Sequence, residues 1–199
     1  MARRHKNRPL RDTVAIVGDG QTERIYFQDV NQTDRPNNLY IFPDIPRRLG
    51  TYQGVLQRAI QLKADFSRVY ALIDMDTIIS ERRQVAYVID KAEAESQGVT
   101  VLENNPCFEL WLLLHFVDTA RPFRNCEEVI RELRREGRLP GYAKTERYLV
   151  TARLYGSYKH LIPEHAKPRA ERLEIGRADQ GEFYPRAELY KFFDWYFGR

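Results

Sequence analysis

Short apolar runs alternate with helical patterns along the first 117 residues of the chain. The runs at residues 13–17, 38–42, 69–73 and 99–103 are continuous and rich in β-branched and aromatic side chains, so they predict four buried strands. Apolar residues at helical spacing predict helices over residues 22–30, 51–66 and 83–97, and a further helix is expected from Pro106. Strands that alternate with helices predict an α/β fold with a mainly parallel sheet flanked by helices.

The region after about residue 118 has a different pattern, in which helical spacing dominates. Loops are expected near residues 137–145, 163–168 and 176–185. The chain then closes with an amphipathic helix that has Pro185 near its first turn. The apolar positions of this last helix are Leu189, Phe192, Phe193 and Tyr196.

This change of pattern divides the chain into two expected parts. We expect an α/β core over residues 1–117 and a helical extension over residues 118–199 that packs on the core. The basic segment of residues 1–12 is expected to be a flexible arm. Charge is also uneven, because residues 131–177 carry 12 Lys or Arg against 6 Asp or Glu, whereas the rest of the chain carries 20 against 22. A basic region beside an acidic one suits a phosphate backbone.

Cysteine content and hydropathy bear on the compartment. Cys107 and Cys126 are the only cysteines, too few for a disulfide framework or a complete metal-ligand set. We expect both to be free thiols in a reducing cytosol. No run of 18 apolar residues occurs, so no transmembrane helix is expected, and the basic N-terminus lacks the apolar core of a signal peptide. These features predict a cytoplasmic protein without a membrane partner.

Three aspartates follow two of the predicted strands. Asp74 and Asp76 follow the strand at residues 69–73, and Asp19 follows the strand at residues 13–17 in the sequence VAIVGDGQTE. The carboxyl ends of parallel strands share one sheet edge, so these side chains are expected to converge. Close carboxylates repel one another unless protons or a cation neutralise them, and Mg²⁺ or Mn²⁺ is the hard cation that prefers oxygen ligands. We therefore predict a divalent-metal site.

The same aspartates also have a simpler interpretation. Asp is common at strand ends as a turn residue or as a helix N-cap, so neither DMDT nor GDG alone indicates a metal. The placement of both groups at one sheet edge favours the metal site.

Three segments of the chain resemble one protein family. VAIVGDGQTERIYF, YALIDMD and NNPCFELWLLLHF agree in order and separation with the RloB-like proteins, a bacterial group with a Toprim-type fold linked to phage defence. The third segment is the most specific, because its run from Asn105 to Phe116 is long and compositionally unusual. The resemblance is good over residues 12–117, and the later segment YPRAELYKF agrees more loosely.

The resemblance implies a set of site residues. Toprim folds carry an acidic residue after the first strand and an Asp-x-Asp pair after a later strand, and they bind divalent metal for DNA strand chemistry. By this resemblance Asp19 takes the first position, and Asp74 with Asp76 forms the pair. The first position is usually Glu in this group, so the shorter Asp19 departs from the pattern at the point where reach matters for proton transfer. Glu23 can supply that reach from the first helical turn.

Glu109 is the other unusual acid, because it lies among Phe108, Leu110 and Trp111. A buried carboxylate must be paired, protonated or bound to a metal. Two roles stay open for Glu109: a structural role near the helix N-terminus, or a catalytic role in the site beside Asp19 and Glu23. His115 does not share the helix face of Glu109 and is expected to be a core or boundary histidine.

Basic side chains are expected to hold a nucleic acid. Lys144 and Arg147 follow a Pro-Gly turn, where side chains are usually exposed, and we assign Arg82 and Arg83 to the same role. Residues 141–160 also interleave basic side chains with tyrosines, a pattern that can track a backbone and stack bases. An amphipathic helix with tyrosines in the core gives the same pattern and is the simpler interpretation.

Other chemistries lack their motifs. GDGQTE has no third glycine for a dinucleotide fingerprint and no Walker A lysine, the four histidines lack metal-ligand spacing, and no G-x-S-x-G elbow occurs. We therefore predict a Mg²⁺- or Mn²⁺-dependent nuclease that acts on DNA or RNA in anti-phage defence. Other defence proteins, or a second copy bound through the aromatic C-terminal helix, are further candidate partners.

Two other functions are weighed against the nuclease. The first is a non-catalytic nucleic-acid-binding or sensor subunit of a defence complex, which the Asp at position 19 favours. The second, a small-nucleotide or phosphate transferase, ranks lower because the basic region indicates a long polyanion.

Overall fold

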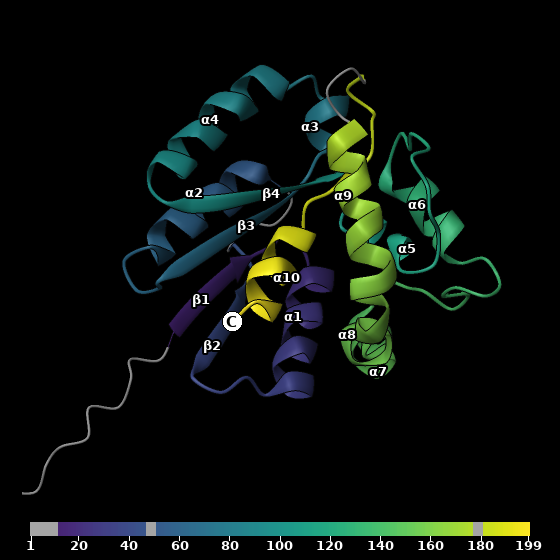
Figure 1. The fold of residues 1–199 in the computed structure, drawn as a ribbon. Coiled ribbons are helices and arrows are strands. Elements are labelled where there is room, and N and C mark those ends of the chain that lie inside the picture. The colour runs from purple at the N-terminus through teal and green to yellow at the C-terminus, as the bar shows by residue number, and fades with distance from the viewer. Residues whose placement is uncertain (1–11, 47–50, 177–180) are drawn as a thin grey trace, which may run out of the picture.

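Four parallel strands and one short antiparallel strand form a single sheet (Figure 1). In this computed structural model, which describes residues 12–46, 51–176 and 181–199, the strand order is β2-β1-β3-β4-β5. The strands are β1 (Asp12–Val17), β2 (Leu39–Asp44), β3 (Arg68–Asp74), β4 (Val99–Asn105) and β5 (Arg186–Ala187). β1 to β4 pair in parallel, and β5 runs antiparallel to β4. The predicted α/β class with a mainly parallel sheet is confirmed.

Helices fill the connections between the strands. Those in the described residues are α1 (Gln21–Asp34), α2 (Tyr52–Leu62), α3 (Asp76–Ser80), α4 (Gln84–Ser96), α5 (Glu109–Leu114), α6 (Cys126–Leu133), α7 (Glu146–Ala152), α8 (Leu154–Tyr158), α9 (Lys167–Ile175) and α10 (Tyr190–Phe197). The hydroxyl of Thr51 caps α2 by accepting from the N–H of Gly54, and Gly98 follows α4 with a positive φ of 82°, as expected for a C-terminal glycine.

A long bent helix lies near the C-terminus (Figure 1). A 3₁₀ turn (Lys159–Leu161) and a π-helical segment (Ile162–Ala166) join α8 to α9 without a break. Wider π-type turns are a recognised cause of helix bending. The predicted loop near residues 163–168 is therefore wrong, because Pro163 and Pro168 lie within continuous helical structure instead of ending it.

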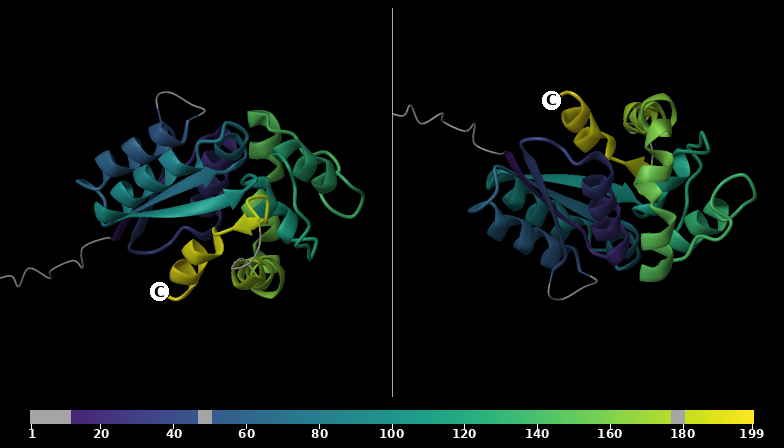
Figure 2. Two further views of the ribbon diagram at one scale, coloured as in Figure 1. Left: turned by 90° about the horizontal axis from the view of Figure 1, so that it is seen from above. Right: turned by 90° about the horizontal axis from the view of Figure 1, so that it is seen from below.

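The helices cover both faces of the sheet, and each face has its own apolar core. Figure 2 shows α2 and α4 on one side of the sheet and α10 on the other. Val55, Leu56 and Ala59 of α2 belong to the first core, with small sheet residues such as Ala71. The second core, which includes side chains of α1, α5 and α10, is rich in aromatic rings; Phe193, for example, stacks on Trp111 at 5.5 Å between ring centroids.

The C-terminal segment adds a strand that the sequence pattern does not indicate. Arg186 and Ala187 of β5 pair with Asn105 and Asn104 of β4. The expectation that Pro185 opens a helix is therefore wrong, and α10 starts at Tyr190. The four predicted apolar positions of this helix are all buried. The division into a core and a helical extension stays a prediction.

Two further points concern the ends and the surface of the chain. The predicted basic arm lies outside the described residues, except for Asp12, which begins β1. Within the described ranges, no helix combines the length and the apolar character needed to cross a membrane.

Candidate functional site

The loop after β1 closes around one buried carboxylate, that of Glu23. A Cβ atom at Gly18 would lie 2.7 Å from the Cβ of Glu23, and one at Gly20 would lie 3.2 Å from Glu23 Oε2, so the two glycines leave space for the acid. Glu23 lies in the first turn of α1 and is only 5% exposed. Asp19, between the glycines, is half-buried, and its charge acts on Glu23.

Asp74 and Asp76 lie where β3 ends and α3 begins. Asp74 Oδ1 accepts a 2.8 Å hydrogen bond from the backbone N–H of Phe108. Asp76 is the first residue of α3, and its Oδ1 accepts a 2.7 Å hydrogen bond from the backbone N–H of Thr77. The two aspartates therefore do not share one strand face, because the chain turns into α3 after Asp74. Both remain partly buried beside the carboxyl end of β3.

Glu109 is a completely buried carboxylate at the start of α5. The hydroxyl of Tyr142 donates a 2.6 Å hydrogen bond to Glu109 Oε1, and Lys144 Nζ forms an ion pair with the same oxygen at 2.9 Å. The side chain of Lys144 is 45% exposed, so its ammonium group reaches inward from the surface. Glu109 is thus a paired carboxylate, held by two residues of the segment between α6 and α7.

Burial and like charge raise the pKa values of these acids. The pKa of Glu23 is raised to about 7, first by burial and then by the charge of Glu109. The pKa of Asp74 is raised well above its usual range by burial, and next by Glu23 and Glu109. Burial is also the main reason that the pKa of Asp76 is raised. Glu23, Asp74, Asp76 and Glu109 therefore form one interacting group, which we name the acid cluster.

Lys144 is a cation that the fold supplies to the acid cluster. Burial acts to lower the pKa of Lys144, but the charges of Glu109, Asp74 and Glu23 outweigh it and raise that pKa. Lys144 in turn lowers the pKa values of Glu23, Asp74 and Asp76. A single ammonium group cannot balance all four carboxylates when they are ionised. The acid cluster therefore carries excess negative charge when all of its carboxylates are ionised, and the predicted Mg²⁺ or Mn²⁺ site stays a prediction.

The acid cluster differs from the predicted site of three aspartates. Glu23, rather than Asp19, is the acid near β1 whose charge chiefly acts on Asp74. Among the described residues, neither Asp19, Asp74 and Asp76 nor Glu23, Asp74 and Asp76 form a set whose ligand atoms all lie within 4.8 Å of one another. A single ion shared by these three aspartates stays a prediction, and Glu23 is the better-placed partner of Asp74.

The expectation of two free thiols is wrong, because Cys107 and Cys126 form a disulfide. The bond joins the segment after β4 to the first residue of α6. The sulfur of Cys126 lies 2.9 Å from Glu109 Oε2 and 3.4 Å from Lys144 Nζ, so the disulfide borders the acid cluster. Cys107, Glu109 and Cys126 lie close enough to share a metal, but a disulfide removes the thiolates that would bind it, and we assign no metal there.

The four basic residues assigned to nucleic acid differ in their surroundings. Arg147 is exposed on α7, and Arg82 and Arg83 are exposed between α3 and α4. Arg83 forms a 3.3 Å ion pair with Glu81 at the surface. These three guanidinium groups are accessible to a polyanion, whereas Lys144 is engaged in the acid cluster.

The aromatic and histidine residues of this region behave as core residues. Tyr142 and Tyr155 are buried, which confirms for these two the simpler interpretation of the tyrosine pattern. His115 is also buried, with Nδ1 2.9 Å from the carbonyl oxygen of Trp111, and burial lowers its pKa to about 4. The prediction of a core histidine is confirmed.

Sequence reasoning did not single out two buried residues beside the acid cluster. Tyr142 appeared only as one tyrosine of an alternating pattern, and its contact with Glu109 depends on the fold. Asn104 is the partner in register of Asp74 and is fully buried. An Asn-Asn pair at the end of an apolar strand is the signal that could have indicated it.

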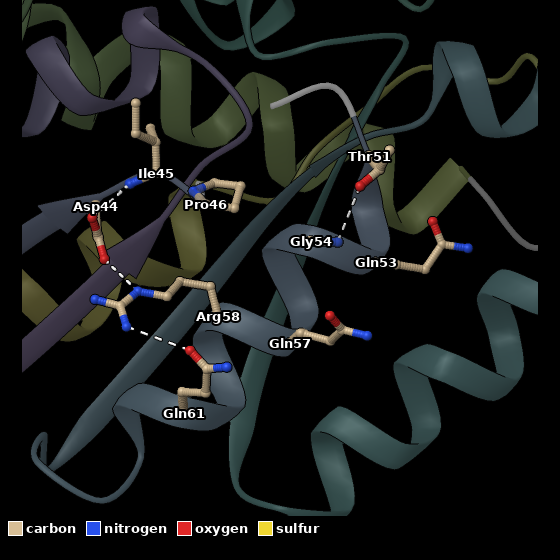
Figure 3. A pocket seen from close by; sticks show the side chains of 9 residues that line it. All are labelled: Asp44, Ile45, Pro46, Thr51, Gln53, Gly54, Gln57, Arg58 and Gln61. Atoms are coloured by element: carbon tan, nitrogen blue, oxygen red, sulfur yellow. Dashed lines mark hydrogen bonds and ion pairs between the residues drawn. The ribbon is translucent and has the colours of Figure 1, made fainter. Parts of the chain in front are cut away.

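A surface pocket lies elsewhere on the molecule, between the end of β2 and α2 (Figure 3). Its carboxylate, Asp44, is engaged by Arg58, with 2.7 Å between Asp44 Oδ2 and Arg58 Nε. The exposed part of the lining contributed by α2 is mainly the amide side chains of Gln53, Gln57 and Gln61. The pocket therefore does not provide a second cluster of carboxylates.

Comparison with known proteins identifies a family. The model of a family described as RloB-like protein matches residues 14–194, a range that includes every residue of the acid cluster. No curated protein and no solved structure matches the chain.

Proposed function

Because the chain belongs to the RloB-like protein family, we propose that it is a divalent-metal-dependent nuclease that cleaves nucleic-acid phosphodiesters in anti-phage defence. The observation that carries the proposal is the acid cluster at the carboxyl edge of a parallel sheet. Ligands of such sheets bind at this edge, and clustered groups with raised pKa values are typical of active sites.

Glu23, Asp74 and Asp76 are the residues that would hold Mg²⁺ or Mn²⁺, with Asp19 beside Glu23. When bound, such a cation neutralises charge on the phosphate and lowers the pKa of a coordinated water. The backbone N–H of Phe108 fixes the carboxylate of Asp74, and the N–H of Thr77 fixes that of Asp76. These two backbone hydrogen bonds orient the carboxylates of Asp74 and Asp76.

The other residues of the cluster set its charge and its protonation. Glu109 holds Lys144 and Tyr142, so the ammonium group of Lys144 lies at the border between the acids and the surface. From there it can contact a phosphate. Glu23 has a pKa raised to about 7 in the metal-free protein, so binding of a cation to its carboxylate would displace a proton near neutral pH.

The exposed arginines would hold the rest of the polyanion. Arg82 and Arg83 follow α3, which begins with Asp76, and Arg147 lies three residues after Lys144. Arg82 and Arg83 are therefore close in sequence to Asp76, and Arg147 is close in sequence to Lys144. A homodimer or a complex with other defence proteins remains a proposal. The aromatic face of α10, offered by the sequence for dimerisation, is buried within this chain.

A cleavage assay with Asp74→Ala combined with Asp76→Ala tests the function. We expect the wild-type protein to cleave DNA or RNA with Mg²⁺ or Mn²⁺ and to stop when EDTA is added, and we expect the double variant to lose at least about 100-fold of the rate. Asp65→Ala, at an exposed aspartate after α2, is the matched control and should cleave like wild type. Undiminished metal-dependent cleavage by the double variant would end the proposal.

A second function is favoured by one observation. Lys144 already neutralises part of the acid cluster, an arrangement that suits a protein that binds nucleic acid without cleaving it. This sensor or binding subunit would retain affinity for nucleic acid and show no turnover at any concentration of Mg²⁺ or Mn²⁺. The cleavage assay, repeated over a metal titration, separates the two functions.

A further inference from the structure

Asn104 carries a buried amide for which the described residues provide no side-chain hydrogen bond. The residue is 0% exposed, and neither Oδ1 nor Nδ2 has a partner. A buried amide without partners disfavours the folded state and is rare in native proteins, so a partner other than a protein side chain, an ion or a water molecule, is expected at this position.

The alternation of β4 places this amide on the same side of the sheet as Asp74. The neighbouring Glu103 points to the opposite side, where Tyr87 and Lys91 of α4 bind its Oε1. Asn104 therefore faces the other core, as Leu102 does. Asp74 is the partner in register of Asn104, and in-register residues of adjacent strands lie about 4.8 Å apart with side chains on one face. The unpaired amide thus lies beside Asp74.

We propose that Asn104 belongs to the divalent-cation site, with Oδ1 as a neutral oxygen ligand and Nδ2 as a hydrogen-bond donor to the carboxylate of Asp74. The inference rests on the proposed function and assigns a residue to its site. An amide suits this place because its oxygen is a hard ligand that brings no further negative charge. The acid cluster already has more carboxylates than Lys144 can balance, so a fifth acid would add repulsion.

Asn105 provides a matched comparison. Its Nδ2 donates 2.8 Å hydrogen bonds to the carbonyl oxygens of Glu182 and Tyr184, so its side chain fixes the segment before β5, although its Oδ1 has no partner among the described residues. It lies on the opposite side of the strand from Asn104. The two adjacent asparagines should therefore respond in opposite ways to the same substitution.

The experiment replaces each asparagine by leucine, which has a similar size and no polar side-chain atoms. The first readout is the thermal midpoint in EDTA, and the second is Mn²⁺ affinity, measured from free Mn²⁺ by electron paramagnetic resonance. For Asn104→Leu we expect the midpoint to rise by about 2–4 °C and the dissociation constant for Mn²⁺ to increase at least about 10-fold. For Asn105→Leu we expect a lower midpoint and an unchanged dissociation constant.

The outcomes separate this inference from the proposed function. If wild type binds Mn²⁺ and Asn104→Leu binds it equally well, the inference is wrong and the proposed function stands. If wild type and all variants fail to bind Mn²⁺ at millimolar concentration, both are wrong. A lower midpoint for Asn104→Leu with unchanged affinity would show that the amide has a structural partner instead.

A second variant keeps the test decisive if Asn104→Leu does not fold. Asn104→Asp keeps the shape and the ligand oxygen, so we expect Mn²⁺ affinity to remain within about 3-fold of wild type or to increase. The added charge beside Asp74 should lower the thermal midpoint in EDTA. A folded Asn104→Asp protein that has lost Mn²⁺ binding would overturn the inference.

Discussion

Replacement of Glu23 by Gln should stabilise the metal-free protein, and the gain should grow with pH. The pKa of Glu23 is raised from 4.5 to about 7, chiefly by burial and then by Glu109. The folded state therefore holds the proton of Glu23 more tightly than the unfolded state does. The stability that this proton provides is complete below about pH 4.5 and is lost as the pH rises through 7.

The magnitude follows from the shift in pKa. At 1.36 kcal/mol per pKa unit, the ionised carboxylate costs the folded state about 3 kcal/mol at pH 8 and only about 1 kcal/mol at pH 5. Glu23→Gln removes this cost, so the free energy of unfolding of the variant should rise relative to wild type by about 2 kcal/mol between pH 5 and pH 8. The shape of the side chain is nearly unchanged, so packing contributes little to the difference.

Urea denaturation in EDTA at several pH values from 4.5 to 8.5 measures this difference. Glu136→Gln is the control, because Glu136 is exposed and lies outside the acid cluster. A difference between Glu23→Gln and wild type that does not change with pH would refute the reasoning. So would a loss of stability that increases toward pH 8.

Three further predictions concern the surroundings of the cluster. Lys144→Met should lower the free energy of unfolding by about 1–2 kcal/mol at pH 8, because Glu109 loses its ion pair. The loss is kept to this size because the side chain of Lys144 is partly exposed and its charge is screened by solvent. Urea denaturation measures the loss, and equal stability of variant and wild type would contradict the prediction. The Cys107–Cys126 disulfide closes a loop with a sequence separation of 19, so its reduction should lower the free energy of unfolding by about 3 kcal/mol. The thermal midpoint should therefore be lower with dithiothreitol than without it, and equal midpoints would contradict this. Arg82→Glu combined with Arg83→Glu should weaken nucleic-acid binding and reduce the slope of log K against log salt by about 1–2, and an unchanged slope would exclude these arginines from the interface.

The apolar runs predicted the parallel strands because a strand covered on both faces is apolar throughout. β5 could not be predicted in the same way, since two residues carry no periodic signal and their pairing with Asn104 and Asn105 depends on the whole fold. The bent helix was missed for a related reason. A loop was expected near residues 163–168, but a π-type turn and the packing of Ile162 and Ala166 in the core keep the segment helical.

The location of the site was more predictable than its membership. The sheet brings the ends of the parallel strands β1 and β3 to one edge, as the sequence pattern predicted, and a functional site at this edge stays a proposal. Which acid faces Asp74 depends on how the loop at Gly18 and Gly20 wraps Glu23, a local geometry with no periodic signal. The inward turn of Lys144 and the disulfide are long-range contacts, and residue type alone does not determine them.

Crystals soaked in Mn²⁺ test the central claim most directly, through an anomalous difference map. We expect a peak within about 2.0–2.3 Å of a carboxylate oxygen of Asp74, with Glu23 also within reach. A map in which Mn²⁺ binds only at exposed carboxylates away from the acid cluster, or nowhere on the protein, would contradict it.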